Sequence, residues 1–222
     1  MLIDMLRGGD ITEIIIGLCV SAFVVFCIIP IHEFAHAFVA NKLGDDTAKN
    51  QGRLTLSPMA HINWIGALMI LLVGFGYAEP VPVNVRNVKM QNKKLAMAII
   101  ALAGPLSNLL VAFVSVFIMF LLNRFGTAGN IMVSSFITFF YYNALINVNL
   151  AVFNFIPVPP LDGSRILFAV LPTKYYFSIM KYERYITIFI LILLLTGALS
   201  TPLSMASSAI IRLFARFFSL IL

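Results

Sequence analysis

Long apolar runs separated by short polar stretches dominate the pattern of this 222-residue chain. The first run contains 18 consecutive residues without a charge, residues 14–31. Apolar runs predict helical segments over residues 11–40, 95–122, 131–155, 185–199 and 203–222. Because about 20 apolar residues cross the hydrocarbon core of a bilayer, the pattern predicts an all-α polytopic membrane protein.

Composition supports this class. The chain is 61% hydrophobic and 11% charged, and its mean hydropathy is +0.99, whereas soluble domains are about 45–50% apolar and about 25% charged. The length accommodates about five to six transmembrane helices in one integral membrane domain, residues 1–222. We therefore expect a multi-pass protein of the cell membrane, in contact with the lipid bilayer. The net charge of +6 is not gathered into a dense basic patch, so no nucleic-acid partner is expected.

One apolar segment is too short to cross the bilayer. Residues 64–77 form a stretch of 14 residues that contains several glycines, which favours a re-entrant or interfacial segment. The prolines of residues 80–85 predict an extended backbone after it. Residues 52–57 alternate in a strand-like way before it. Together these segments predict a re-entrant, β-like hairpin after the first helix.

The distribution of basic residues tests this hairpin. If residues 64–77 do not cross, the loops 41–94 and 156–184 lie on one side and carry 11 lysines and arginines, against Arg7 and Arg124 on the other. If the segment does cross, the bias falls to 9 against 4. Because basic loops remain in the cytoplasm, the stronger asymmetry favours the re-entrant arrangement, with the N-terminus outside.

Candidate chemistry lies at the end of the first helix. Residues 32–36 read His-Glu-Phe-Ala-His, inside a helix of membrane length. Histidines four residues apart lie on one face of a helix, where both imidazoles can bind one zinc ion, and the glutamate between them is placed to act on water. Polar groups at membrane depth are costly, so a chance match is a poor explanation for His32, Glu33 and His36.

A catalytic zinc site needs a third protein ligand, and Asp162 is the best candidate. The other carboxylates considered lie in polar turns, in a basic loop or before a proline-rich stretch: Asp45, Asp46, Glu79 and Glu183. In the re-entrant arrangement the first helix and the helix over residues 131–155 run in the same direction. His32, His36 and Asp162 then share the cytoplasmic end of the molecule.

Four motifs together resemble the site-2 protease family of intramembrane zinc metalloproteases. They are residues 32–36 (HEFAH), 79–84 (EPVPVN), 104–108 (GPLSN) and 154–163 (NFIPVPPLDG). The resemblance covers roughly residues 11–170, and the pair of zinc motifs in this order is its most specific part. The chain looks like a compact member without a PDZ or CBS domain, and its motif helix is the first span, whereas some relatives have another span before it.

The resemblance implies a function. One Zn²⁺ per chain would be held by His32, His36 and Asp162, and Glu33 would act as general base toward an activated water. The catalytic core would occupy about residues 11–170, and residues 185–222 would form C-terminal helices. Substrates would be transmembrane proteins cut in or near their spans, for regulated proteolysis or for clearance of signal-peptide remnants.

Two further polar residues have open interpretations. Asn154 would either donate a hydrogen bond to a substrate carbonyl or oxyanion, or cap its helix or join two helices. His61 would either support the metal site from outside the ligand shell or act as a hydrogen-bonded loop residue. Most of the remaining asparagines in the apolar segments favour hydrogen bonds between helices: Asn108, Asn143, Asn147 and Asn149.

Two rival functions come from other classes of protein. A metal transporter could place histidine and aspartate in its spans, although it would normally carry more intramembrane acids. A catalytically inactive membrane-embedded metal-binding protein could keep the fold, but it would have no use for Glu33. Both rivals predict that Glu33→Gln leaves function intact, whereas a protease requires that carboxylate. Nothing in the pattern specifies an oligomeric state.

Overall fold

The computed structural model describes residues 11–73, 76, 78–127 and 129–221. The described residues contain helices and no strand, and four helices among them have the length and composition needed to cross a membrane. The fold is therefore that of a polytopic membrane protein, as predicted. The four candidate spans are Ile14–Lys42, Lys93–Phe125, Ile131–Asn154 and Ser200–Leu220.

The first span is a continuous helical rod in three parts. It contains α2 (Ile11–Phe23), a π-helical turn η1 (Val24–Ile28) and α3 (Ile29–Lys42). Pro30 lies two residues after the end of the π-helical turn. Because proline lacks an N–H and crowds the preceding turn, a local change of helical pitch accommodates it without ending the helix. The rod therefore continues past Pro30 and carries the motif histidines.

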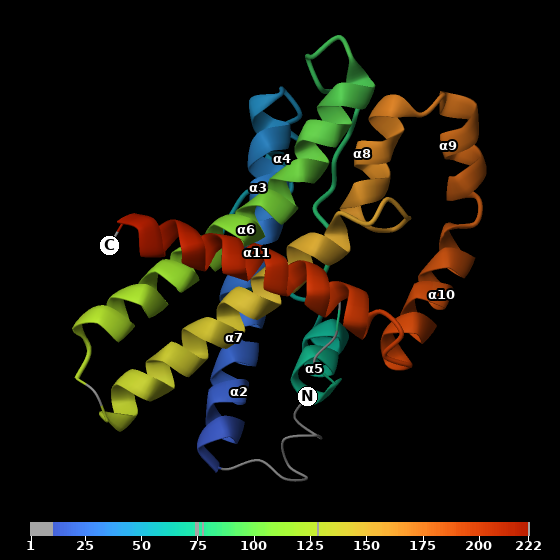
Figure 1. The fold of residues 1–222 in the computed structure, drawn as a ribbon. Coiled ribbons are helices and arrows are strands. Elements are labelled where there is room, and N and C mark those ends of the chain that lie inside the picture. Colours follow the sequence, from blue (N-terminus) through green and yellow to red (C-terminus); the bar gives the residue numbers. More distant parts are fainter. Residues whose placement is uncertain (1–10, 74–75, 77, 128, 222) are drawn as a thin grey trace.

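Two long helices form the centre of the molecule. α6 (Lys93–Phe125) and α7 (Ile131–Asn154) pack along each other, and α3 and α8 (Asp162–Val170) pack against α6 (Figure 1). The side chains of Asn92 and Asn130 cap the N-termini of α6 and α7 by accepting hydrogen bonds from the backbone. Asn143 donates a hydrogen bond of 2.8 Å to Ser115 Oγ, which joins α7 to α6 as the asparagine pattern predicted.

A short helical hairpin follows the first span. It includes α4 (Thr47–Asn50), η2 (Pro58–Ala60) and α5 (Trp64–Val73). The backbone N–H of Glu79 donates to the carbonyl of His61 over 3.1 Å, so the chain before α5 and the chain after it lie side by side. The strand-like character predicted for residues 52–57 is wrong, because they form turns and bends. Residues 74, 75 and 77 of the predicted hairpin lie outside the described residues.

The C-terminal part begins where three prolines end α7. It contains α8 (Asp162–Val170), α9 (Thr173–Met180), α10 (Glu183–Leu195) and α11 (Ser200–Ile221). α10 is 13 residues long, shorter than a full span, whereas α11 is 22 residues long and packs across α6 and α7 (Figure 1). The count of five to six spans thus remains a prediction beside the four helices of sufficient length.

Candidate metal centre

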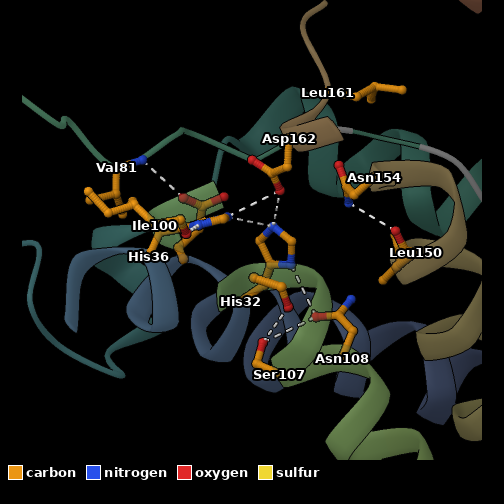
Figure 2. Close-up of polar contacts among 12 residues, drawn as sticks. His32, His36, Val81, Ile100, Ser107, Asn108, Leu150, Asn154, Leu161 and Asp162 are labelled. Carbon is orange, nitrogen blue, oxygen red and sulfur yellow. Dashed lines mark hydrogen bonds and ion pairs between the residues drawn. The ribbon is translucent and has the colours of Figure 1, made fainter. Parts of the chain in front are cut away.

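Two imidazoles of α3 form the first half of the centre. His32 and His36 lie one helical turn apart, with ring centroids 4.7 Å apart and ring planes at 82°. Their Nε2 atoms approach to 3.1 Å (Figure 2). Two Nε2 lone pairs at this distance do not attract each other. The arrangement is therefore that of two metal ligands directed at one point.

Asp162 supplies the third ligand atom from the first turn of α8. Its Oδ2 lies 3.3 Å from His32 Nε2 and 3.2 Å from His36 Nε2 (Figure 2). A carboxylate binds a metal ion in its ionised form, so this oxygen is a suitable third donor.

The backbone around Asp162 explains how it reaches the histidines. Gly163 follows it, and a Cβ at this position would lie 2.4 Å from the carbonyl oxygen of Ile156 and 2.5 Å from that of Phe155. Only glycine allows this close return of the chain beneath α8. The break after α7 therefore folds the aspartate back toward the two histidines of α3.

The spacing of the three ligand atoms fits zinc. Zinc with bonds of about 2.0–2.1 Å and tetrahedral geometry separates its ligand atoms by about 3.3 Å. The three observed separations of 3.1, 3.2 and 3.3 Å match that edge. Two imidazole nitrogens and one carboxylate oxygen form a typical catalytic donor set that leaves a fourth position open. Within the described part of the chain, no other group of three or more His, Cys, Asp or Glu side chains could hold a metal ion.

α6 orients both imidazoles from behind. His36 Nδ1–H donates to the carbonyl of Ile100 over 2.7 Å, and His32 Nδ1–H donates to Asn108 Oδ1 over 3.1 Å (Figure 2). Protonation at Nδ1 leaves the Nε2 lone pair of each ring directed at the third ligand. Asn108 was predicted to join helices, and it does, but its partner is a ligand histidine. The GPLSN motif was the signal for this role.

Gly104 allows α6 to approach the ligands. A Cβ at this position would lie 2.3 Å from His36 Nε2 and 2.6 Å from His32 Nε2. Any side chain would therefore occupy the space next to the two ligand nitrogens. The neighbouring Pro105 is also buried, within the same helix.

Glu33 lies beside the ligands at the wall of a cavity of about 780 Å³. Its side chain is buried, and its Oε2 accepts a hydrogen bond of 2.9 Å from the backbone N–H of Val81. Most of the cavity lining is apolar and comes from the first span, α5, α7 and α10, for example Ile28, Ile70, Leu150, Phe153, Leu191 and Leu194. Such a cavity can receive apolar side chains next to a carboxylate and a metal centre.

The structure separates the other two predicted site residues from the ligands. Asn154 lines the cavity, but its amide donates over 3.0 Å to the carbonyl of Leu150 in its own helix (Figure 2). His61 is fully buried in the loop before α5, where Nε2–H donates to the carbonyl of Thr55 over 2.8 Å. Among the described contacts, none joins His61 to the three ligands.

Comparison with known proteins places this sequence among relatives that are named as zinc metalloproteases. The model of peptidase family M50 matches residues 124–197, which include Asp162. The chain is 40% identical over 195 residues to "Putative zinc metalloprotease YwhC" of Bacillus subtilis (strain 168), covering 84% of this chain and 87% of that protein. No solved structure gives a significant match.

Two further relatives are more distant. "Putative zinc metalloprotease Rip2" of Mycolicibacterium smegmatis is 28% identical over 175 residues, 77% of this chain and 64% of that protein. "Putative zinc metalloprotease MJ0611" of Methanocaldococcus jannaschii is 31% identical over 136 residues, 61% of this chain and 62% of that protein.

Proposed function

Because the chain belongs to peptidase family M50, the site-2 protease family, we propose that it is an intramembrane zinc endopeptidase that cuts membrane-embedded segments of other proteins. One observation carries this proposal. The ligand atoms of His32, His36 and Asp162 meet at tetrahedral spacing, and Glu33 adjoins them at the wall of an apolar cavity.

The donor set defines which residues would hold the metal and what they would do. His32, His36 and Asp162 would hold one zinc ion, whose chemistry when bound is Lewis-acid activation of a water and of a peptide carbonyl. Glu33 would take a proton from the attacking water and pass it to the leaving amine nitrogen. Its buried position keeps bulk solvent from competing for that proton.

The cavity supports a membrane-embedded substrate. Its lining is mostly apolar, and the amides of Asn108, Asn149 and Asn154 are among its few polar groups. A peptide bond in a helical span is already hydrogen-bonded, so a substrate must unwind locally before it reaches Glu33. We propose Asn154 as a candidate donor to the unwound backbone, which requires its amide to leave the carbonyl of Leu150.

We also propose that the site opens toward the cytoplasm and that the N-terminus lies outside. The supporting observations are the 11-to-2 distribution of basic residues and the hydrogen bond between Glu79 and His61, which returns the α5 hairpin to its starting side. Within this arrangement α5 is re-entrant, and the ligand-bearing ends of α3 and α7 share one side.

The test is a comparison of membrane proteomes from cells that carry the wild-type protein or Glu33→Gln. The expected result is that uncut membrane fragments accumulate only with the variant. Identical cleavage states of all membrane proteins in the two strains would contradict the proposal.

A further inference from the structure

An extended segment between α5 and α6 passes directly over the Glu33 carboxylate. Pro80 and Pro82 have no backbone N–H, so Val81 carries the only amide between Glu79 and Val83. That amide is the one that donates to Glu33 Oε2, over 2.9 Å. The sequence itself favours this hydrogen bond, because the flanking prolines extend the backbone and leave the Val81 N–H as the single donor.

Packing holds the Val81 side chain while its amide faces Glu33. Val81 is 7% exposed and packs with Ala37 of α3, Ala48 of α4 and the partly buried Leu54. Ala37 lies one helical turn beyond Glu33, so the apolar contact and the hydrogen bond fix the same stretch of α3 to the same residue.

Two charged side chains clamp the segment on either side of Val81. Before it, Arg53 donates from Nη2 to the carbonyl of Glu79 over 2.7 Å and to that of Pro80 over 3.3 Å. After it, the fully buried Asp45 accepts from the N–H of Asn84 over 2.6 Å. A segment without regular secondary structure would otherwise sample many conformations, so these clamps reduce the freedom of the Val81 amide.

We propose that the Val81 N–H is the group that orients the Glu33 carboxylate, and that Asp45 and Arg53 are positioning residues that hold residues 79–84 in place for it. No other hydrogen bond to Glu33 is described in the structure, so the second carboxylate oxygen is left for the cavity side. The catalytic consequence of this contact depends on the proposed protease function, but the contact itself does not.

Hydrogen exchange at residue resolution tests the contact without any activity. In the purified full-length, zinc-loaded protein, we expect slow exchange at the Val81 amide and at least about tenfold faster exchange in Glu33→Ala. The Asn84 amide, which is bonded to Asp45, is the internal control and should not change in that variant. In Asp45→Ala both amides should exchange faster, and Asp45→Asn, which keeps an acceptor, should restore slow exchange. Equal Val81 exchange in wild type and Glu33→Ala would overturn the proposal.

Kinetics test the catalytic role. Val81→Pro removes the N–H from a segment that already carries prolines, and Val83→Pro is the matched control because no hydrogen bond of the Val83 amide is described. We expect Val81→Pro to lower kcat about tenfold or more, with KM and zinc content unchanged, and Val83→Pro to resemble wild type. An equal kcat for the two variants would overturn the role.

The two experiments also separate this inference from the proposed function. If the wild-type protein cuts no membrane substrate, the protease proposal fails, while the exchange rate of Val81 still decides the contact with Glu33. If Val81→Pro does not fold, the exchange rates of the Val81 amide in Glu33→Ala and Asp45→Ala still test the proposed contact.

Discussion

At the scale of single residues, the absence of a side chain at Gly104 is as important as the ligands themselves. Alanine there would place a Cβ 2.3 Å from His36 Nε2, in the space next to both ligand nitrogens. We predict that Gly104→Ala loses zinc, measured as metal per chain in the purified protein. Leu106→Ala is the matched control, because that side chain of the same helix is 53% exposed, and its zinc content should equal that of wild type.

Asn108 offers a graded test of ligand orientation. Alanine removes the acceptor of His32 Nδ1–H, so the ring loses its fixed tautomer and direction. We predict that zinc affinity, measured by competition with a chelator, falls about 10- to 100-fold in Asn108→Ala. Asn108→Asp keeps an acceptor and should bind zinc far more tightly than the alanine variant. Equal affinities for the two variants would remove Asn108 from the metal site.

Asp45 makes a prediction about pH. Burial alone would raise the pKa of Asp45, but hydrogen bonds from Thr47, Asn84 and Asn87 lower that pKa below its unfolded value. A carboxylate with a lowered folded pKa stabilises the protein above the unfolded pKa, and this contribution is lost as pH falls through the folded pKa. As the pH is lowered from 7 to about 3, the temperature of thermal unfolding should therefore fall more steeply for wild type than for Asp45→Asn. Parallel pH profiles would contradict this.

The residue scale also shows what sequence could and could not predict. His32, Glu33, His36 and Asp162 were candidates because their side chains carry the chemistry at recognisable spacing, and the structure brings the three ligand atoms together. Val81 and the carbonyl of Ile100 act through the backbone, which leaves no signature in residue type.

At the scale of elements, the long apolar helices followed from hydropathy, because α6 and α7 need only length and apolar character to be recognised. The strand-like alternation of residues 52–57 led to a wrong prediction. Their backbone is held by turns and by the contact of Arg53 with Glu79, and not by a neighbouring strand. α8 and α9 are short and partly polar, so they lack the long apolar run by which the other helices were recognised.

The hairpin of α5 yields a prediction about sidedness. Cysteines introduced at the exposed positions Leu56 and Arg86, in a background without the native cysteines, should react with a membrane-impermeant maleimide from the cytoplasmic side. A cysteine at the exposed Thr127, between α6 and α7, should react only from the opposite side. Labelling of Leu56 and Arg86 from opposite sides would show that α5 crosses the membrane and would contradict the re-entrant arrangement.

At the scale of the whole molecule, the elements converge on one centre from three directions. α3 carries Glu33 and the two histidines. Asp162 comes from the first turn of α8, and α6 forms hydrogen bonds with both imidazoles (Figure 2). The segment of Val81 contacts the Glu33 carboxylate, and Asp45 of the loop between α3 and α5 binds the same segment at Asn84. No single element holds the whole centre. The sequence could therefore indicate its residues, but it could not predict how they lie relative to one another.

The most direct measurement combines zinc content and cleavage for the purified wild-type protein and Glu33→Gln, with a single-span membrane protein as substrate. The account predicts one zinc ion per chain in both proteins, cleavage by wild type, and no cleavage by the variant, because the substitution removes the base and leaves the ligands. Cleavage by Glu33→Gln at the wild-type rate would contradict it.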